Sequence, residues 1–339
     1  MARMVAAFAS SHSVMLTCTL RDWQEGFRDF DPKGSFHDRS GNVVSYQQLL
    51  ALAPANAEQL VSDEAVARRY EAVQRAMGRM RKEVQAAKLD VLIVCGDDQN
   101  ELFNKNLQPS LALYHGDDIL NGKKKDVPSD AWYRIAQNGR LEDVEGVRLP
   151  VDGKLAKYLI HGLLDRDFDV ASLAGTDPGK YVGHAYSFIH KKYIEGTVLP
   201  MVPIFLNTHY DPNQITPRRC VDVGLAIGEL VASYPSDIRV GFMASGGLSH
   251  FQVEEDLDEA VMQAMKNKDL DFLRRLDVAR LKAGSSEIRN WLVLAGACGG
   301  LDMDWISYSP GYRTDALTGT GLAFATWYPP GVVRDTLSA

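Results

Sequence analysis

Short apolar runs that stop abruptly in polar residues constrain the fold of this 339-residue chain more than any other feature. Met4–Ala9 runs into SSHS, Val91–Cys95 into GDDQNE, and Ile238–Met243 into ASGGLSH. Similar runs are Ser110–Tyr114, Phe168–Leu173 and Met201–Leu206. Because longer segments with helical periodicity separate these runs, we expect an α/β fold with a central mixed sheet and helices on both faces.

The helical segments support one continuous unit. Ser62–Ala87 has apolar residues at helical spacing on one face, and Cys220–Ser233 and Ser285–Ala297 repeat this periodicity. Glu254–Arg275 is heavily charged and is predicted to be a solvated helix, whereas 117–150 has the composition of a surface excursion. The chain shows no repeat and no low-complexity linker, so a single domain spanning residues 1–339 is predicted.

The composition argues against two classes of partner, nucleic acids and lipid membranes. The net charge of −7 gives no basic field for a nucleic-acid backbone, and no apolar stretch approaches the roughly 20 residues of a membrane helix. Cys18, Cys95, Cys220 and Cys298 are far apart and form no metal-binding or disulfide pattern. A cytoplasmic protein with a small-molecule partner is therefore expected.

Histidines gather where the predicted strands end. His12, His115, His209 and His250 each follow a strand within a few residues, and His184 lies in a later loop. Ligands of α/β sheets bind outside the carboxyl ends of the strands, so the site is expected at that edge of the sheet. Neutral imidazole binds transition metals and also carries protons near neutral pH. Any one of these histidines taken alone is more often structural.

Five segments in order resemble one family. They are SSH at His12, VCGDD after the next strand, VGHAYS around His184, SGGLSH ending at His250, and GSSEIRNWLVLAGA around Glu287. Together they cover most of the chain, and this pattern is similar to the class III extradiol ring-cleavage dioxygenases of the protocatechuate 4,5-dioxygenase β-subunit type. The resemblance implies oxidative cleavage of a catechol or gallate-like phenol with O2.

The resemblance also implies roles for the matched residues. A non-haem Fe(II) would be held by two histidines and a carboxylate, with His12 as the first ligand and Glu287 as the carboxylate. His250 would be the catalytic acid and base that exchanges a proton with the substrate hydroxyl. His184 would be a second catalytic residue, lying just outside the metal ligands and hydrogen-bonding the substrate or oxygen.

One position departs from the family pattern. Gln99 stands where the β-subunit type has its second histidine ligand, and an amide oxygen is a poor substitute for imidazole on Fe(II). His37, in FHDRSGNVVSY, resembles a loop of the branch that includes 3-O-methylgallate 3,4-dioxygenase, and it is the expected replacement ligand. Gln99 would then bind substrate. The alternative is an iron-free homologue of the same fold that acts as a binding or scaffolding protein.

Other polar residues have two interpretations each. Asp97 and Asp98 could form a carboxylate pair at the metal, but capping of loop amides is the more common role of acidic residues after a strand. Tyr210, Tyr312 and Arg313 have the side chains that recognise an aromatic acid. The resemblance implies a homo-oligomer, and it leaves open whether a separate small α-type chain closes the pocket.

Overall fold

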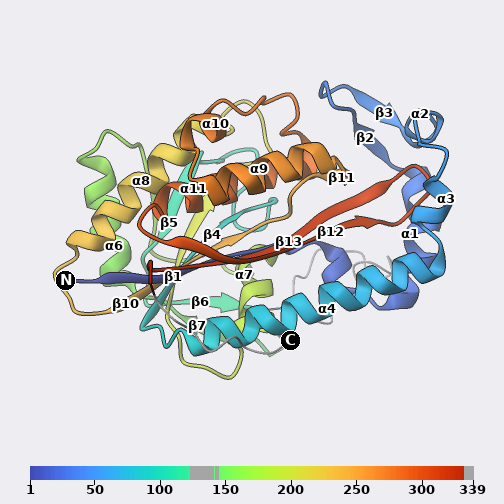
Figure 1. The fold of residues 1–339 in the computed structure, drawn as a ribbon. Helices are drawn as coiled ribbons and strands as arrows, with labels where there is room; N and C mark the ends of the chain where they lie inside the picture. The colour runs from blue at the N-terminus through green and yellow to red at the C-terminus, as the bar shows by residue number, and fades with distance from the viewer. Residues whose placement is uncertain (123–140, 142–144, 332–339) are drawn as a thin grey trace.

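A nine-stranded mixed sheet organises the part of the chain that the computed structural model describes, which is residues 1–122, 141 and 145–331 (Figure 1). Its strands are β1 (Arg3–Ser10), β4 (Val91–Asp97), β5 (Leu111–Tyr114), β8 (Ala171–Leu173), β9 (Met201–Leu206), β10 (Arg239–Ser245), β11 (His250–Gln252), β12 (Asp302–Tyr312) and β13 (Thr318–Tyr328). The spatial order is β11-β13-β1-β10-β4-β9-β5-β8, with β12 beside β13. β1, β10, β4 and β9 are parallel, whereas β13 runs antiparallel to its neighbours, and β5 runs antiparallel to β9 but parallel to β8. The predicted mixed sheet is confirmed.

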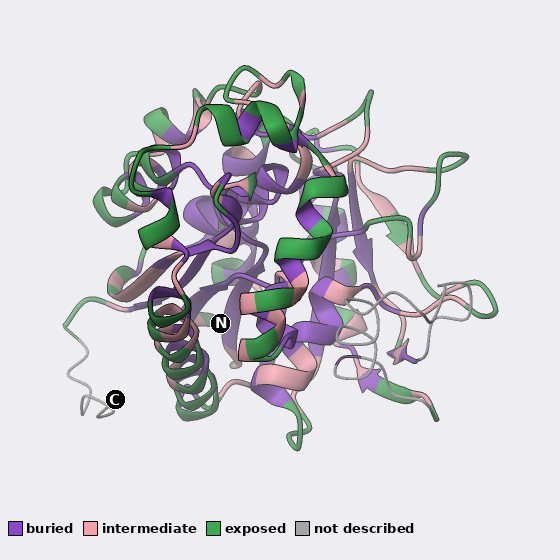
Figure 2. Cartoon of the chain, turned by 90° about the vertical axis from the view of Figure 1, so that its right-hand side faces the viewer, coloured by how far each residue is buried: buried purple, intermediate pink, exposed green. Residues whose placement is uncertain are grey.

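Helices cover both faces of the sheet. The helices are α1 (Phe27–Phe30), α2 (Tyr46–Ala51), α3 (Ala57–Leu60), α4 (Asp63–Ala86), α6 (Gly153–Leu164), α7 (His184–Ile189), α8 (Pro217–Ser233), α9 (Glu255–Asn267), α10 (Leu270–Arg274) and α11 (Ile288–Ala297). Alternate residues of β1 enter different cores: Ala7 and Ala9 join one, and Ala6 and Phe8 join the other. The first core contains α6, α8 and α11, and the second contains α4 and α7. Figure 2 shows this buried centre enclosed by helices with exposed outer surfaces.

Two predicted helices have different outcomes. Ser62 caps α4 by accepting a hydrogen bond from the Ala65 amide, so this helix begins and ends within one residue of its predicted bounds. The charged segment Glu254–Arg275 is instead divided into α9 and α10, because Lys268 adopts the left-handed conformation between them. Leu257 and Val261 of α9 are buried, so the expectation of a solvated helix was wrong for that face.

Helices α8 and α11 touch through glycines. A Cβ atom on Gly224 of α8 would overlap the Val293 carbonyl oxygen, and a Cβ on Gly296 of α11 would overlap the Val221 carbonyl oxygen. The two backbones therefore pack in direct contact. This contact fixes α11 against the sheet, and the residue directly before α11 is Glu287.

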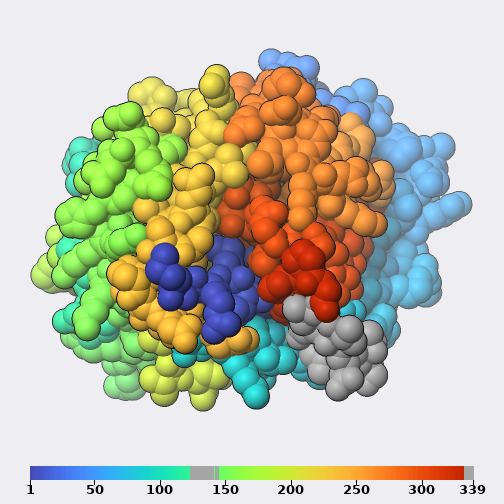
Figure 3. All heavy atoms as spheres, turned by 60° about the vertical axis from the view of Figure 1, so that its left-hand side comes forward, coloured from blue at the N-terminus to red at the C-terminus, as the bar shows by residue number. Residues whose placement is uncertain are grey.

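The last two strands bring the C-terminal part of the described chain beside its N-terminal strand. β13 pairs with β1, and the sequence pattern gave no strand prediction for β12 or β13. Figure 3 shows N-terminal residues beside the C-terminal part of the described chain on one face. Smaller sheets pair β2 (Ser35–His37) with β3 (Val43–Ser45), and β6 (Asp118–Asn121) with β7 (Val147–Pro150).

The predicted surface excursion at 117–150 is only partly described. β6 and β7 lie within it, whereas 123–140 and 142–144 fall outside the described residues. Across the described ranges, every helix is too short or too polar to cross a lipid bilayer.

Candidate metal centre

Four buried or half-buried side chains meet at the carboxyl ends of the central strands. His12 lies two residues beyond β1, Asp97 ends β4, and His184 begins α7. Glu287 is the last residue of the 3-10 turn Ala283–Glu287, immediately before α11. One potential ligand atom from each of these four side chains lies within 4.8 Å of all the others. The structure thus brings together three of the residues singled out in the family pattern, and it adds Asp97.

The His12 ring presents a lone pair to two carboxylates. Ser245 Oγ donates its hydrogen to the Ala185 carbonyl, so the contact of 2.9 Å between His12 Nδ1 and Ser245 Oγ requires Nδ1 to be the donor. In neutral His12 the Nε2 atom is therefore unprotonated. This atom lies 3.2 Å from Glu287 Oε2 and 3.7 Å from Asp97 Oδ1.

Glu287 is held as a carboxylate. Its Oε2 accepts a hydrogen bond from the Gly247 amide at 2.7 Å, and its Oε1 lies 3.3 Å from His250 Nε2. Burial alone would raise the pKa of Glu287, but His12 and His250, when protonated, place positive charges and hydrogen-bond donors beside it, and these outweigh burial and hold this pKa well below its ordinary value.

Asp97 is a second buried carboxyl group in the same space. Burial raises its pKa, and the neighbouring Glu287 charge raises it further. Gln99 Nε2 donates to Asp97 Oδ2 at 3.0 Å and to Glu287 Oε1 at 3.3 Å, so the Gln99 amide bridges the two carboxylates. The sequence favoured a capping role for Asp97, because a polar residue after a strand has the same local pattern in both roles.

A cation fits this group. His12 Nε2 and Asp97 Oδ1 are buried and have no hydrogen-bond partner among the described residues. Burying two carboxylates together with an unpartnered imidazole nitrogen costs desolvation free energy, and a bound metal ion would offset this cost. Imidazole nitrogens combined with carboxylate oxygens are a donor set that suits Fe(II).

His184 is held by Glu101, a residue that the sequence did not single out. Glu101 Oε1 lies 2.8 Å from His184 Nδ1, and the rings of His12 and His184 pack edge to face with centroids 4.7 Å apart. His184 was predicted to lie outside the metal ligands, but its ring reaches the metal-binding group itself. Glu101 follows β4 in a polar loop, and its partner is 83 residues away, so no local pattern pointed to it.

His250 borders Glu287 on the other side. It begins β11, and its Nδ1 donates to the Leu248 carbonyl at 2.8 Å, which leaves Nε2 facing Glu287. Burial lowers the pKa of His250, but the Glu287 carboxylate and the Leu248 carbonyl more than offset burial, so this pKa lies above its ordinary value. A proton carrier is thus placed next to the metal-binding group.

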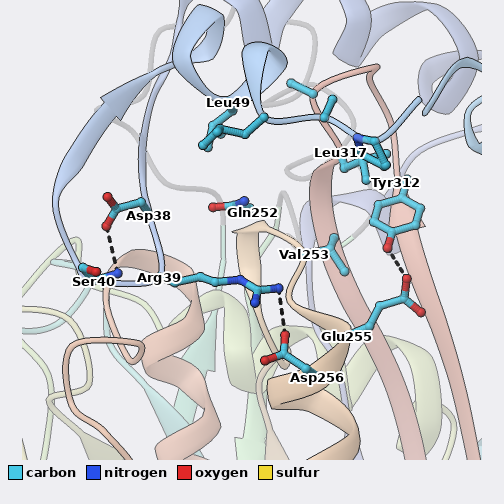
Figure 4. Close-up of a pocket in the computed structure, with 14 residues that line it drawn as sticks. Asp38, Arg39, Ser40, Leu49, Gln252, Val253, Glu255, Asp256, Tyr312 and Leu317 are labelled. Carbon is cyan, nitrogen blue, oxygen red and sulfur yellow. Dashed lines mark hydrogen bonds and ion pairs between the residues drawn. The ribbon is translucent and has the colours of Figure 1, made fainter. Parts of the chain in front are cut away.

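The structure does not bring His37 into this group. His37 ends β2 opposite Val43 of β3, and its Nδ1 is buried without a hydrogen-bond partner in the described ranges. The residues after it, Asp38–Ser40, line a separate pocket of about 540 Å³, together with Leu49 and Gln252 (Figure 4). The metal-ligand role expected of His37 stays untested, and His184 is the alternative second histidine.

Four other residues named from the sequence have hydrogen-bond or ion-pair partners in the structure. Asp98 accepts hydrogen bonds from the amides of Glu101, Leu102 and Phe103, which is the capping role favoured from the sequence. Arg313 forms a buried two-point ion pair with Asp31, at 2.6 and 3.0 Å, and Tyr312 donates to Glu255. The expected recognition of an aromatic acid by Arg313 is therefore wrong, because its guanidinium is already paired. Tyr210 accepts a hydrogen bond from Asn100 Nδ2.

Comparisons with known proteins identify the family of the chain. The chain is 25% identical over 248 residues to a 2,3-dihydroxyphenylpropionate/2,3-dihydroxicinnamic acid 1,2-dioxygenase of Comamonas testosteroni. The match covers 71% of this chain and 66% of the relative, just under two thirds of its length. Residues 145–323, which are more than half of the chain, match the family described as the catalytic LigB subunit of aromatic ring-opening dioxygenase. The chain therefore belongs to the LigB family of aromatic ring-opening dioxygenases.

Proposed function

We propose that this chain is a non-haem Fe(II)-dependent extradiol dioxygenase that opens the ring of a catechol or gallate-like phenol with O2. The observation that carries the proposal is the buried, unpartnered His12 Nε2 atom facing the Glu287 and Asp97 carboxylates. Membership of a family of ring-opening dioxygenases supports the aromatic substrate class.

We assign His12, His184 and Glu287 as the metal ligands, with Asp97 as a fourth donor beside them. Each imidazole uses Nδ1 for a hydrogen bond, His12 to Ser245 and His184 to Glu101, so each directs Nε2 away from that partner. His12, His184 and Glu287 would hold a ferrous ion, which would supply the electron transfer between a bound catechol and O2 that ring opening needs.

His250 supplies the proton transfer in this proposal. Its Nε2 accepts the proton of a substrate hydroxyl, and the Glu287 carboxylate 3.3 Å away stabilises the resulting imidazolium. The fixed Nδ1 bond to Leu248 keeps the ring aimed in one direction, so the same Nε2 returns the proton as the ring opens.

Gln99 has a positioning role in this arrangement. Its Nε2 already contacts Asp97 and Glu287, so its carbonyl oxygen is the group that can accept a hydrogen bond from a substrate hydroxyl. This assignment keeps Gln99 as a substrate-binding residue and does not require His37 at the metal.

The iron-free binding protein remains the competing function, because Gln99 replaces an expected histidine. The two differ in a direct assay. Protein reconstituted anaerobically with Fe(II) should consume O2 in an oxygen electrode with at least one of protocatechuate, gallate, 3-O-methylgallate or 2,3-dihydroxyphenylpropionate, and should yield the ring-opened product. If the O2 concentration stays unchanged with all four substrates and the reconstituted protein holds no iron, the binding-protein function is supported.

A further inference from the structure

The Glu101 side chain lies between Gln99 and His184 and is held by hydrogen bonds. Its side chain is only 8% exposed, and its backbone is fixed because Asp98 accepts hydrogen bonds from the Glu101, Leu102 and Phe103 amides. Its second carboxylate oxygen, Oε2, accepts a hydrogen bond from the backbone amide of Gln99 at 3.3 Å. The carboxylate therefore has little freedom to turn.

Both contacts with His184 use a single carboxylate oxygen. Glu101 Oε1 accepts a hydrogen bond from the His184 backbone amide at 2.8 Å and lies 2.8 Å from the His184 ring atom Nδ1. An ionised carboxylate can only accept hydrogen bonds, so the ring proton is on Nδ1. The lone pair of neutral His184 is then on Nε2.

Gly183 provides the space for this approach. A Cβ atom at position 183 would overlap Glu101 Oε2, although the Gly183 backbone, with φ −66°, is one that any residue adopts. The need for glycine therefore comes from the carboxylate and not from the chain conformation.

We propose that Glu101 is a positioning residue that fixes the tautomer and ring orientation of His184, so that Nε2 points into the metal-binding group. This inference rests on the proposed ligand role of His184. Carboxylates that hold a ligating histidine in this way contribute 10- to 100-fold to metal affinity in other sites. The purely structural alternative is that Glu101 only caps α7, by accepting the His184 amide bond.

Two variants separate these roles. Glu101→Gln removes the charge and keeps the shape, whereas Gly183→Ala keeps every polar group and displaces the carboxylate. Glu83→Gln is the matched control, because Glu83 is another buried carboxylate, with Arg79 at 3.3 Å and Tyr328 at 2.9 Å, located on α4. Thermal unfolding of the three apoproteins measures any loss of fold.

The readouts are metal affinity and the His184 tautomer. Anaerobic titration of apoprotein with Co(II) should show 10- to 100-fold weaker binding for both site variants and less than a twofold change for Glu83→Gln. Nitrogen-15 NMR of histidine-labelled apoprotein should show the Nδ1-protonated tautomer at His184 in the wild type and a mixture of tautomers in Glu101→Gln. Unchanged tautomer and unchanged affinity in both variants would overturn the proposal.

The same measurements distinguish this inference from the proposed function. If wild-type protein binds metal but cleaves no catechol, the proposed function fails and the affinity ratio still decides the role of Glu101. If wild-type protein binds no metal, the metal-positioning role of Glu101 is overturned. A His184 tautomer that still depends on Glu101 would then show that Glu101 only orients the His184 ring.

Discussion

His12 Nε2 lies 3.2 Å from Glu287 Oε2, although the two residues come from opposite ends of the chain. β1 delivers the histidine, and the turn before α11 delivers the carboxylate. No hydrogen on a neutral His12 can join these two atoms, because its ring proton is engaged by Ser245. A positive charge between them, either a metal ion or a second imidazole proton, is what the geometry requires.

The choice of second histidine ligand is testable by substitution. His184→Ala should abolish stoichiometric metal retention, because it removes an Nε2 lone pair from the group. His37→Ala should leave metal content unchanged, because His37 lies outside the group. Metal analysis of both proteins after anaerobic reconstitution checks this, and the opposite pattern would restore His37 as the ligand.

Loss of the proton carrier should separate chemistry from binding. His250→Phe should lower kcat about 10²- to 10⁴-fold while metal content stays at the wild-type level, because the ring is not among the ligands. His161→Phe, at an exposed position of α6, is the matched control and should have near-normal kcat. Steady-state O2 consumption measures both, and near-normal turnover of His250→Phe would exclude its role as acid and base.

The Asp31–Arg313 pair should be important for stability. Both side chains are at most 3% exposed, so Asp31→Ala leaves an unpaired buried guanidinium and should reduce the free energy of unfolding by about 3–5 kcal/mol. Asp237→Ala breaks an exposed pair with Arg3 and should cost less than about 1 kcal/mol. Urea unfolding measures both values. Equal effects would show that the buried pair has no special contribution.

Asp258 should make folding stability depend on pH. Burial raises its pKa to about 6, against about 3.9 in an unfolded chain, so the folded protein keeps a proton that the unfolded chain releases between these values. The free energy of unfolding therefore falls as pH rises from about 4 to about 6, by about 3 kcal/mol from this group. Asp258→Asn should lack this component. Urea unfolding at several pH values measures it, and parallel profiles for the two proteins would contradict it.

Local patterns predicted the elements whose causes are local. The Ser62 cap and the amphipathic face of α4 lie within the helix, and the abrupt polar ends of β1 and β4 placed His12 and Asp97 at one side of the sheet. The hairpin β12–β13 was not foreseen, because its glycines and SPG segment depart from strand alternation. Pairing across the sheet, with β1 and β11 as partners of β13, stabilises it instead.

Which residues form the site depends on packing between segments that are far apart in the sequence. The family pattern identified His12, His184, His250 and Glu287, but which histidine lies beside His12 depends on which loops meet. The role of Asp97 has the same basis: its sequence context fits a cap, and only the approach of Glu287 makes it a potential ligand. The Glu101–His184 contact, between residues 83 positions apart, has no signal in either segment alone.

Anaerobic titration of the apoprotein with Fe(II), repeated for His12→Ala and Glu287→Ala, is the most direct test of the metal centre. We expect wild-type protein to bind one iron per chain, and we expect each substitution to abolish saturable binding. A wild-type protein that binds no iron, or variants that bind it as tightly as wild type, would contradict the assignment.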